Sequence, residues 1–221
     1  MKSITKLFLY LLLTFSISVQ SSVQNEYSSF SVIGNNNVIN KPGAIELGFK
    51  FALKDGWHTY WLNAGDSGGP AVFEYKNNSN LVISDITWPG PQKIPYPPLM
   101  TYGFKNDLVI PFKLTLNNLE DSQIEIKTKF LVCDDICIPQ NDSFSLELKN
   151  GILNIKQAPN ELLKWKSLIP ARGPPVEIVF PNQNGALEII SDQIDEGSYF
   201  FPYIDGVIDY SAAQKITIKN H

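Results

Sequence analysis

The chain has 221 residues, of which 43% are hydrophobic and 18% are charged. This composition is typical of a globular protein with a substantial core, and the length fits one large domain or two modest ones. The formal net charge is −4 at pH 7, and the sequence contains no block of Lys or Arg. Electrostatics therefore give no support to nucleic acid or an anionic membrane as a partner.

The first 22 residues, MKSITKLFLYLLLTFSISVQSS, have the pattern of a secretory signal peptide. Lys2 and Lys6 precede an apolar run from Leu7 to about Val19, and small residues suited to cleavage follow. The apolar run is shorter than the roughly 20 residues that a membrane-spanning helix needs, and no later segment is apolar enough to span. We therefore expect residues 1–22 to be removed, leaving an exported protein with no membrane span.

From Tyr27 to Leu148 the pattern is that of β-strands: short alternating runs separated by Gly, Pro and Asn. The strand candidates are AIELGFKFAL, AVFEY, LVISDITW, LVIPFKLTL, IEIKTKFLV and SFSLEL. Strands of this length and spacing predict an all-β domain, an immunoglobulin-like antiparallel sandwich that we place at residues 27–150.

One segment after the sandwich, residues 157–171, has the pattern of a helix. Pro159 lies near its start, apolar residues recur at helical spacing, and Pro170 marks its end. We expect this helix to be a linker. Beyond it, VEIVF, ALEIIS, YFFPYI and KITIKN resemble strands, but residues 175–221 are too few for another full sandwich, so we expect an incomplete second β unit.

The stretch GDSGGP resembles the nucleophile segment of trypsin-type serine proteases. A Ser nucleophile needs a His and an acid, which trypsin-type enzymes carry on a preceding β-barrel. Only about 45 residues of mature chain precede Ser67, and His58 is the only histidine among them. That is too short for the protease fold, so we expect a glycine-rich turn. Its structural residues are Gly65, Asp66, Gly68 and Pro70.

Aromatic residues and a histidine lie just before this turn. Trp57, Tyr60 and Trp61 are in a strand-like stretch, where aromatic side chains more often pack in a core than bind a ligand. His58 alternates with Trp57 and should face the other way. We expect His58 to be a surface or turn-supporting residue.

The cysteines, Cys133 and Cys137 in FLVCDDICIPQ, are spaced C-x3-C. In an oxidising compartment they are expected to pair. A disulfide needs Cα atoms about 4.4–6.8 Å apart, whereas residues i and i+4 of a straight strand lie roughly 13 Å apart. The chain must therefore reverse between the cysteines, and Asp134 and Asp135 suit a turn.

Several roles are open to such a pair. A loop this small removes little entropy from the unfolded chain and stabilises by less than roughly 3 kcal/mol, while tight bridges tend to be reducible. The spacing favours redox chemistry, with a local structural staple as the alternative. Asp134 and Asp135 disfavour a thiolate, which indicates chemistry gated by a docked partner. Two thiolates could bind Cu(I), whereas a tetrahedral zinc site would need two further ligands. We predict that the chain holds no metal and no other cofactor.

Four motifs in order resemble a known family: GWHTYWLNAGDSGGP, TWPGPQKIP, PPLMTYGFKNDLVIPFKL and FLVCDDICIP. They are similar to the N-terminal periplasmic domain of the DsbD-type transmembrane thiol-disulfide reductases, and more closely to that of ScsB-type proteins linked to copper tolerance. The resemblance covers about Tyr27 to Leu148. A weaker similarity, in YFFPYIDGVIDYSAAQ, is to the second immunoglobulin-like part of ScsB proteins.

The resemblance implies a periplasmic domain whose catalytic cysteines, here Cys133 and Cys137, take electrons from a DsbD/ScsB-type transmembrane module. The cysteines then pass the electrons to periplasmic thioredoxin-like or disulfide isomerase proteins. One thiol attacks the partner disulfide and the other resolves the mixed disulfide, and the sequence does not say which does which. The alternative is a non-enzymatic interaction or copper-tolerance module with a structural disulfide. The resemblance also places a cap loop over the cysteines, at Met100, Thr101, Tyr102 and Gly103. In the family a Phe of this loop shields the disulfide, and the matching position here holds Met100 or Thr101. Tyr102 or Phe104 is the aromatic residue expected to take the place of that Phe.

Overall fold

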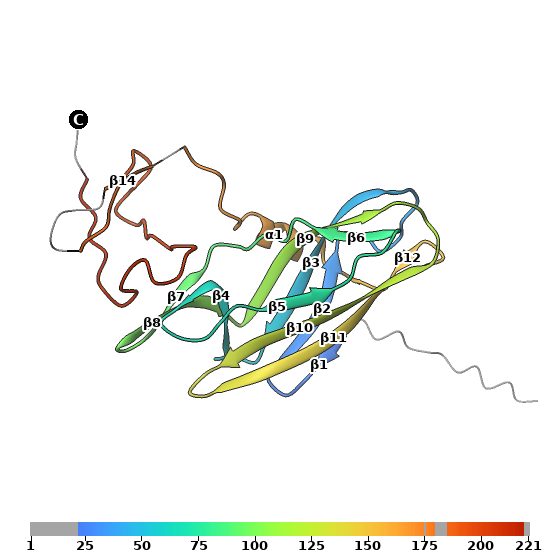
Figure 1. Ribbon diagram of the computed structural model, residues 1–221. Coiled ribbons are helices and arrows are strands. Elements are labelled where there is room, and N and C mark those ends of the chain that lie inside the picture. Colours follow the sequence, from blue (N-terminus) through green and yellow to red (C-terminus); the bar gives the residue numbers. More distant parts are fainter. Residues whose placement is uncertain (1–21, 175, 180–184, 219–221) are drawn as a thin grey trace, which may run out of the picture.

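The computed structural model describes residues 22–174, 176–179 and 185–218 (Figure 1). The expected signal peptide, residues 1–22, lies outside these ranges apart from Ser22. Two β-sheets pack face to face and form most of the molecule. A sandwich of antiparallel strands is thus confirmed over the region where the sequence predicts it.

The two sheets differ in which part of the chain they use. In spatial order, the first sheet contains β1 (Ser22–Gln24), β2 (Ser28–Gly34), β3 (Gly43–Leu53), β9 (Asp107–Leu116) and β6 (Leu81–Ser84), and β13 (Lys156–Gln157) pairs in parallel with β2. The second contains β12 (Ile152–Leu153), β11 (Cys137–Lys149), β10 (Ser122–Cys133), β4 (His58–Gly65), β8 (Leu99–Lys105) and β7 (Gln92–Tyr96), and β5 (Val72–Tyr75) also pairs with β10. All six strand candidates of the sequence form strands: β3, β5, β6, β9, β10 and β11.

Period-two alternation explains why these segments form strands. In β10, Ile124 and Ile126 are buried in the sandwich, while Glu125 and Lys127 between them are exposed. Side chains that alternate in this way put one face of a strand on the core and the other in water. Cys133 ends β10 on the outward face and is nevertheless buried, so something other than the core covers it.

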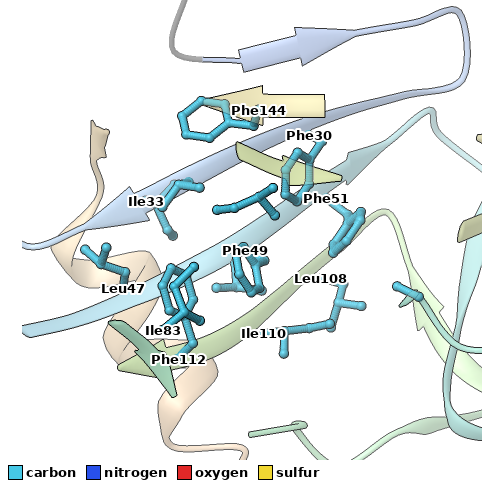
Figure 2. Packing of buried hydrophobic residues seen from close by; sticks show 14 of the residues in the cluster. Phe30, Ile33, Leu47, Phe49, Phe51, Ile83, Leu108, Ile110, Phe112 and Phe144 are labelled. Atoms are coloured by element: carbon cyan, nitrogen blue, oxygen red, sulfur yellow. The ribbon is translucent and has the colours of Figure 1, made fainter. Parts of the chain in front are cut away.

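The sandwich core is rich in aromatic residues (Figure 2). Phe30, Phe49 and Phe51 from β2 and β3 lie against Phe112 from β9 and Phe144 from β11, and the rings of Phe49 and Phe112 are stacked with centroids 4.1 Å apart. Burying one such side chain contributes about 2 kcal/mol. The core lies between the sheets, so their outward faces are left for other uses.

The segment predicted as a helix forms α1 (Pro159–Lys166), with Pro159 in its first turn. Its apolar face is not free: Leu162 and Trp165 are buried in the core, and the Trp165 ring lies 5.8 Å from that of Phe104. Lys50 of β3 forms a partly buried ion pair with Glu161. The helix therefore packs on the sandwich. Among the described residues it is the one helix, and it is too short to cross a membrane.

The region after α1 contains less β structure than the sequence indicates. Among the described residues of this region, only β14 (Glu177–Val179) and β15 (Glu188–Ile190) pair, as a two-stranded antiparallel sheet. The predicted strand at 199–204 is wrong, because these residues lie in no strand. Of the strand predicted at 215–220, residues 215–218 lie in no strand and 219–220 lie outside the described residues. The aromatic side chains of the first of these segments pack against β4 and β8 instead of alternating across a sheet.

We call residues 199–210 the C-terminal strap, because they lie against the sandwich beside β4 and β8. The ring centroids of Phe201 and Tyr210 are 4.9 and 5.5 Å from that of Tyr102, and Tyr203 lies 5.0 Å from Trp61. Trp61 and Tyr102 belong to the same apolar cluster as the sandwich core. The aromatic side chains of the strap thus extend the core beside β4 and β8.

Candidate functional site

The disulfide closes the tip of the β10–β11 hairpin. The two strands pair in register from Ser122 opposite Leu148 to Cys133 opposite Cys137, and the chain reverses through 134–136. The cysteine Cα atoms are 4.1 Å apart, and their sulfurs are bonded. The reversal that the C-x3-C spacing requires is present. A long hairpin that pairs over its whole length fixes the position of this bond relative to the sheet.

The two cysteines differ in their exposure to solvent. Cys133 is 1% exposed, whereas Cys137 and the neighbouring Ile136 lie exposed at the hairpin tip. A thiol of another molecule can therefore approach Cys137 but not Cys133. The asymmetry distinguishes two residues that the sequence leaves equivalent.

Tyr60 of β4 covers the buried side of the disulfide. Its phenol donates a hydrogen bond to Cys133 Sγ at 2.8 Å and lies 3.3 Å from Cys137 Sγ. Tyr60 is 2% exposed and clusters with Ala64 and Cys133 outside the main core. Burial raises the pKa of the phenol, and a side-chain hydrogen bond with Ser67 partly opposes this. The phenol therefore stays a donor at neutral pH.

The glycine-rich turn rests on the Tyr60 ring. Gly68 has φ +85°, and a Cβ there would lie 2.1 Å from Cε1 of Tyr60, so only glycine fits. The hydroxyls of Ser67 and Thr101 lie 2.8 Å apart. GDSGGP thus forms a turn, as expected from its glycines, and the turn also packs against the residue that contacts both sulfurs.

The expected cap residues and the expected structural turn form one unit. Asp66 N donates to Met100 O at 2.9 Å, and Met100 N donates to Asp66 Oδ2 at 2.8 Å. Gly65 has φ +80° and lies so close that a Cβ would be 2.4 Å from Met100 O. The segment expected as a cap loop is strand β8, with Gly103 opposite Tyr60. Met100–Gly103 thus hold the turn in place.

The aromatic residue against the disulfide is not one of those expected. Tyr102 and Phe104 are buried in the main core, where Tyr102 contacts the C-terminal strap and Phe104 contacts Trp165. Tyr60, expected as core packing, contacts the sulfurs instead. A signal was available, since Tyr60 and Trp61 are adjacent in a strand and only one of them can face the core.

His58 also lies at this site, half-buried on the outward face of β4, opposite to buried Trp57 as the alternation predicts. It is the residue of β4 that pairs with Cys133, and its ring is 5.4 Å from the Tyr60 ring in an edge-on arrangement. Burial lowers the pKa of the imidazole, the charge of Lys105 lowers it further, and Asp134 opposes the shift. His58 is therefore neutral at neutral pH. Within the described residues no group of three His, Cys, Asp or Glu side chains is arranged to hold a metal.

The fold and the site together define an immunoglobulin-like β-sandwich with a disulfide at a hairpin tip, covered from inside by a tyrosine and open to solvent at one sulfur. A family model described as thiol:disulfide interchange protein DsbD, N-terminal, matches residues 32–149, just over half of the chain. The chain therefore belongs to the family of DsbD-type thiol:disulfide interchange protein N-terminal domains.

A solved structure shares this fold. The N-terminal periplasmic domain of ScsB from Proteus mirabilis matches with a TM-score of 0.51 and 17% identity, over 71% of this chain and 61% of that one. The immunoglobulin-like fold is thereby confirmed, and the chain spans about 61% of the length of that domain. The N-terminal domain of DsbD from Neisseria meningitidis in the reduced form matches with a TM-score of 0.30 and 10% identity, over 50% of this chain and 81% of that one. No curated protein sequence matches significantly.

Proposed function

We propose that Cys133 and Cys137 form a redox pair that relays electrons in the periplasm. The proposed donor is a DsbD/ScsB-type transmembrane module, and the proposed acceptors are oxidised thioredoxin-like or disulfide isomerase proteins. One observation carries the proposal: an exposed cysteine, Cys137, is bonded to a buried cysteine, Cys133, whose sulfur accepts a hydrogen bond from Tyr60. Export by the segment 1–22 is part of the same proposal.

The difference in exposure between the two cysteines supports one order for the exchange. A thiolate of the reduced donor attacks Cys137 Sγ, the Cys133–Cys137 bond breaks, and Cys133 leaves as a thiolate that accepts the Tyr60 hydrogen bond. The second thiolate of the donor then attacks the donor sulfur that is bonded to Cys137. This step closes a disulfide in the donor and releases Cys137 as a thiolate. Two electrons pass to the domain, the donor becomes a disulfide, and two protons from water complete the dithiol.

Electrons leave the domain by the reverse sequence. The Cys137 thiolate attacks the disulfide of an acceptor and forms a mixed disulfide with it. Cys133 then loses its proton to water and attacks Cys137 Sγ, which restores the bridge and releases the acceptor as a dithiol. Cys137 is therefore the attacking residue and Cys133 the resolving residue.

Single cysteine variants test this order. Cys133→Ser should accumulate a mixed disulfide between Cys137 and an added thioredoxin-fold protein that keeps only its attacking active-site cysteine, activated as a disulfide with thionitrobenzoate, because thionitrobenzoate leaves and neither protein then has a resolving thiol. Cys137→Ser should trap far less, because the remaining sulfur is buried. Equal trapping by both variants would contradict the assignment.

The reduction potential of the wild-type pair, measured in glutathione buffers, tests the function itself. If neither variant traps a partner and the reduction potential lies below about −300 mV, the disulfide is an inert structural bridge. The chain would then be the interaction or copper-tolerance module of the alternative hypothesis. In that case a double Cys→Ala variant should still bind its partners.

A further inference from the structure

Asn63 of β4 connects the candidate site to the C-terminal strap. Its side chain is 4% exposed, and its Nδ2 lies 2.9 Å from Pro202 O, 3.2 Å from Ile204 O and 3.2 Å from the Tyr210 hydroxyl. Its Oδ1 accepts a hydrogen bond of 3.0 Å from Gly65 N. One buried amide thus binds the strap with its nitrogen and the start of the glycine-rich turn with its oxygen.

The strap end of this connection is itself well held. The Tyr210 hydroxyl donates to Asp205 Oδ1 at 2.5 Å and accepts from Gly206 N at 2.6 Å. The Tyr210 ring packs on Tyr102, and its side chain is 5% exposed. Asn63 therefore bonds to a segment that is anchored by both packing and hydrogen bonds, and such a segment can restrain its neighbour.

The other end leads to the sulfurs in three contacts. Gly65, whose N–H binds Asn63, begins the turn, and Gly68 of the same turn lies against the Tyr60 ring. Tyr60 in turn donates to Cys133 Sγ. A displacement of the turn would leave one side of the Tyr60 ring without support, and the phenol would no longer be held at its position beside the disulfide.

We propose that Asn63 is a positioning residue for the redox pair, and that the C-terminal strap acts through it to hold the turn and Tyr60 over the disulfide. The strap is thus a part of the redox unit that lies outside the segment matched by the family model, residues 32–149. The proposal rests on the proposed function, since Tyr60 needs positioning only if the disulfide is redox-active. The effect of Asn63 on the disulfide can nevertheless be measured without any protein partner.

A matched pair of asparagines separates positioning from stability. Asn80 is also buried, at 5% exposed, and bonds the backbone of Glu120 and Asn118 through its side chain, with no contact to the site. Both Asn63→Ala and Asn80→Ala remove a buried amide that is hydrogen bonded at both ends. Both should lower the thermal unfolding temperature, but only Asn63→Ala should change the disulfide.

The measurement is the rate at which dithiothreitol reduces the disulfide in the folded protein, together with the reduction potential in glutathione buffers. Loss of these hydrogen bonds should slow reduction about fivefold to tenfold in Asn63→Ala, because Tyr60 is then less well placed to donate to the departing Cys133 thiolate, while Asn80→Ala keeps the wild-type rate. Tyr210→Phe, which keeps the ring and loses the hydroxyl, should show a smaller decrease in the rate. It serves as the test if Asn63→Ala does not fold.

Wild-type rates in Asn63→Ala, or in Tyr210→Phe where Asn63→Ala does not fold, would overturn the proposal. Equal slowing in Asn80→Ala would also overturn it, because the effect would then not depend on the contact with the site. Dithiothreitol reports on the placement of Tyr60 beside the bridge whatever the biological role of the bridge, whereas the trapping of a thioredoxin-fold protein by Cys133→Ser reports on the proposed function. The two can therefore fail independently.

Discussion

Tyr60 and Cys133 lie 73 residues apart in the chain and are joined by a hydrogen bond of 2.8 Å from the phenol to Sγ. A buried hydroxyl needs a partner, and the disulfide sulfur supplies it here. When Cys133 becomes a thiolate, the same hydrogen bond has a charged acceptor and is correspondingly stronger. The contact therefore favours the reduced, ionised form of Cys133 over the bridged form.

Tyr60→Phe tests this effect, because it keeps the ring against Gly68 and removes only the donor. A hydrogen bond to a charged group contributes about 1.5–3 kcal/mol, so the pKa of the Cys133 thiol in the reduced protein should rise by about one unit or more. The measurement is a titration of thiolate absorbance in a Cys137→Ser background, with and without Tyr60→Phe. An unchanged thiol pKa would show that the phenol does not stabilise the thiolate.

Gly68→Ala should damage the site, because its Cβ would meet the Tyr60 ring and its φ of +85° is unfavourable for alanine. We expect a loss of about 1–3 kcal/mol in the free energy of unfolding and slower reduction of the disulfide, because the displaced phenol no longer stabilises the departing Cys133 thiolate. Gly69→Ala is the control, since a Cβ there meets nothing within 4 Å. Urea unfolding measures both variants, and equal stabilities would contradict the packing described for Gly68.

The pH dependence of stability should contain a contribution from His58. Its pKa is lowered in the folded protein, mainly by burial, so the unfolded chain takes up a proton near pH 6.5 while the folded protein does so only at lower pH. Stability from this group is complete above pH 6.5 and is lost as the pH falls through that value toward the folded-state pKa.

His58→Gln should therefore lose less stability than wild type between about pH 7 and pH 5. The comparison isolates His58 from Asp142, whose pKa is raised by burial and whose effect has the opposite sign at lower pH. Free energies of unfolding from urea titrations at several pH values give the two slopes. Parallel curves would mean that His58 titrates alike in the folded and unfolded chain.

Adjacent leucines in α1 test whether the helix is a linker or part of the sandwich. Leu162 is 1% exposed and Leu163 is 66% exposed. Leu162→Ala should lower the free energy of unfolding by about 2–5 kcal/mol, while Leu163→Ala should change it by about 0.5 kcal/mol or less. Thermal or urea unfolding of the two variants decides between them. Equal small effects would favour the linker that the sequence indicates.

Local patterns were sufficient for most of the sandwich. The alternation of β10 and β11 predicts two strands, and the spacing of Cys133 and Cys137 requires the chain to reverse between them, because a straight strand holds such residues too far apart. The glycines of GDSGGP predict a turn for a similarly local reason. Each of these features depends on residues within a few positions of one another.

Sequence patterns alone predict six strands of the sandwich, the hairpin turn and the bridge at its tip. Which aromatic residue contacts that bridge depends on tertiary contacts, because the faces of Tyr60 and Trp61 depend on how β4 pairs with β8 and β10. Tertiary contacts also decide the state of 199–204, where aromatic residues suited to a strand pack on Trp61 and Tyr102. Propensity describes a residue and its neighbours, whereas burial depends on surfaces that only the folded chain brings together.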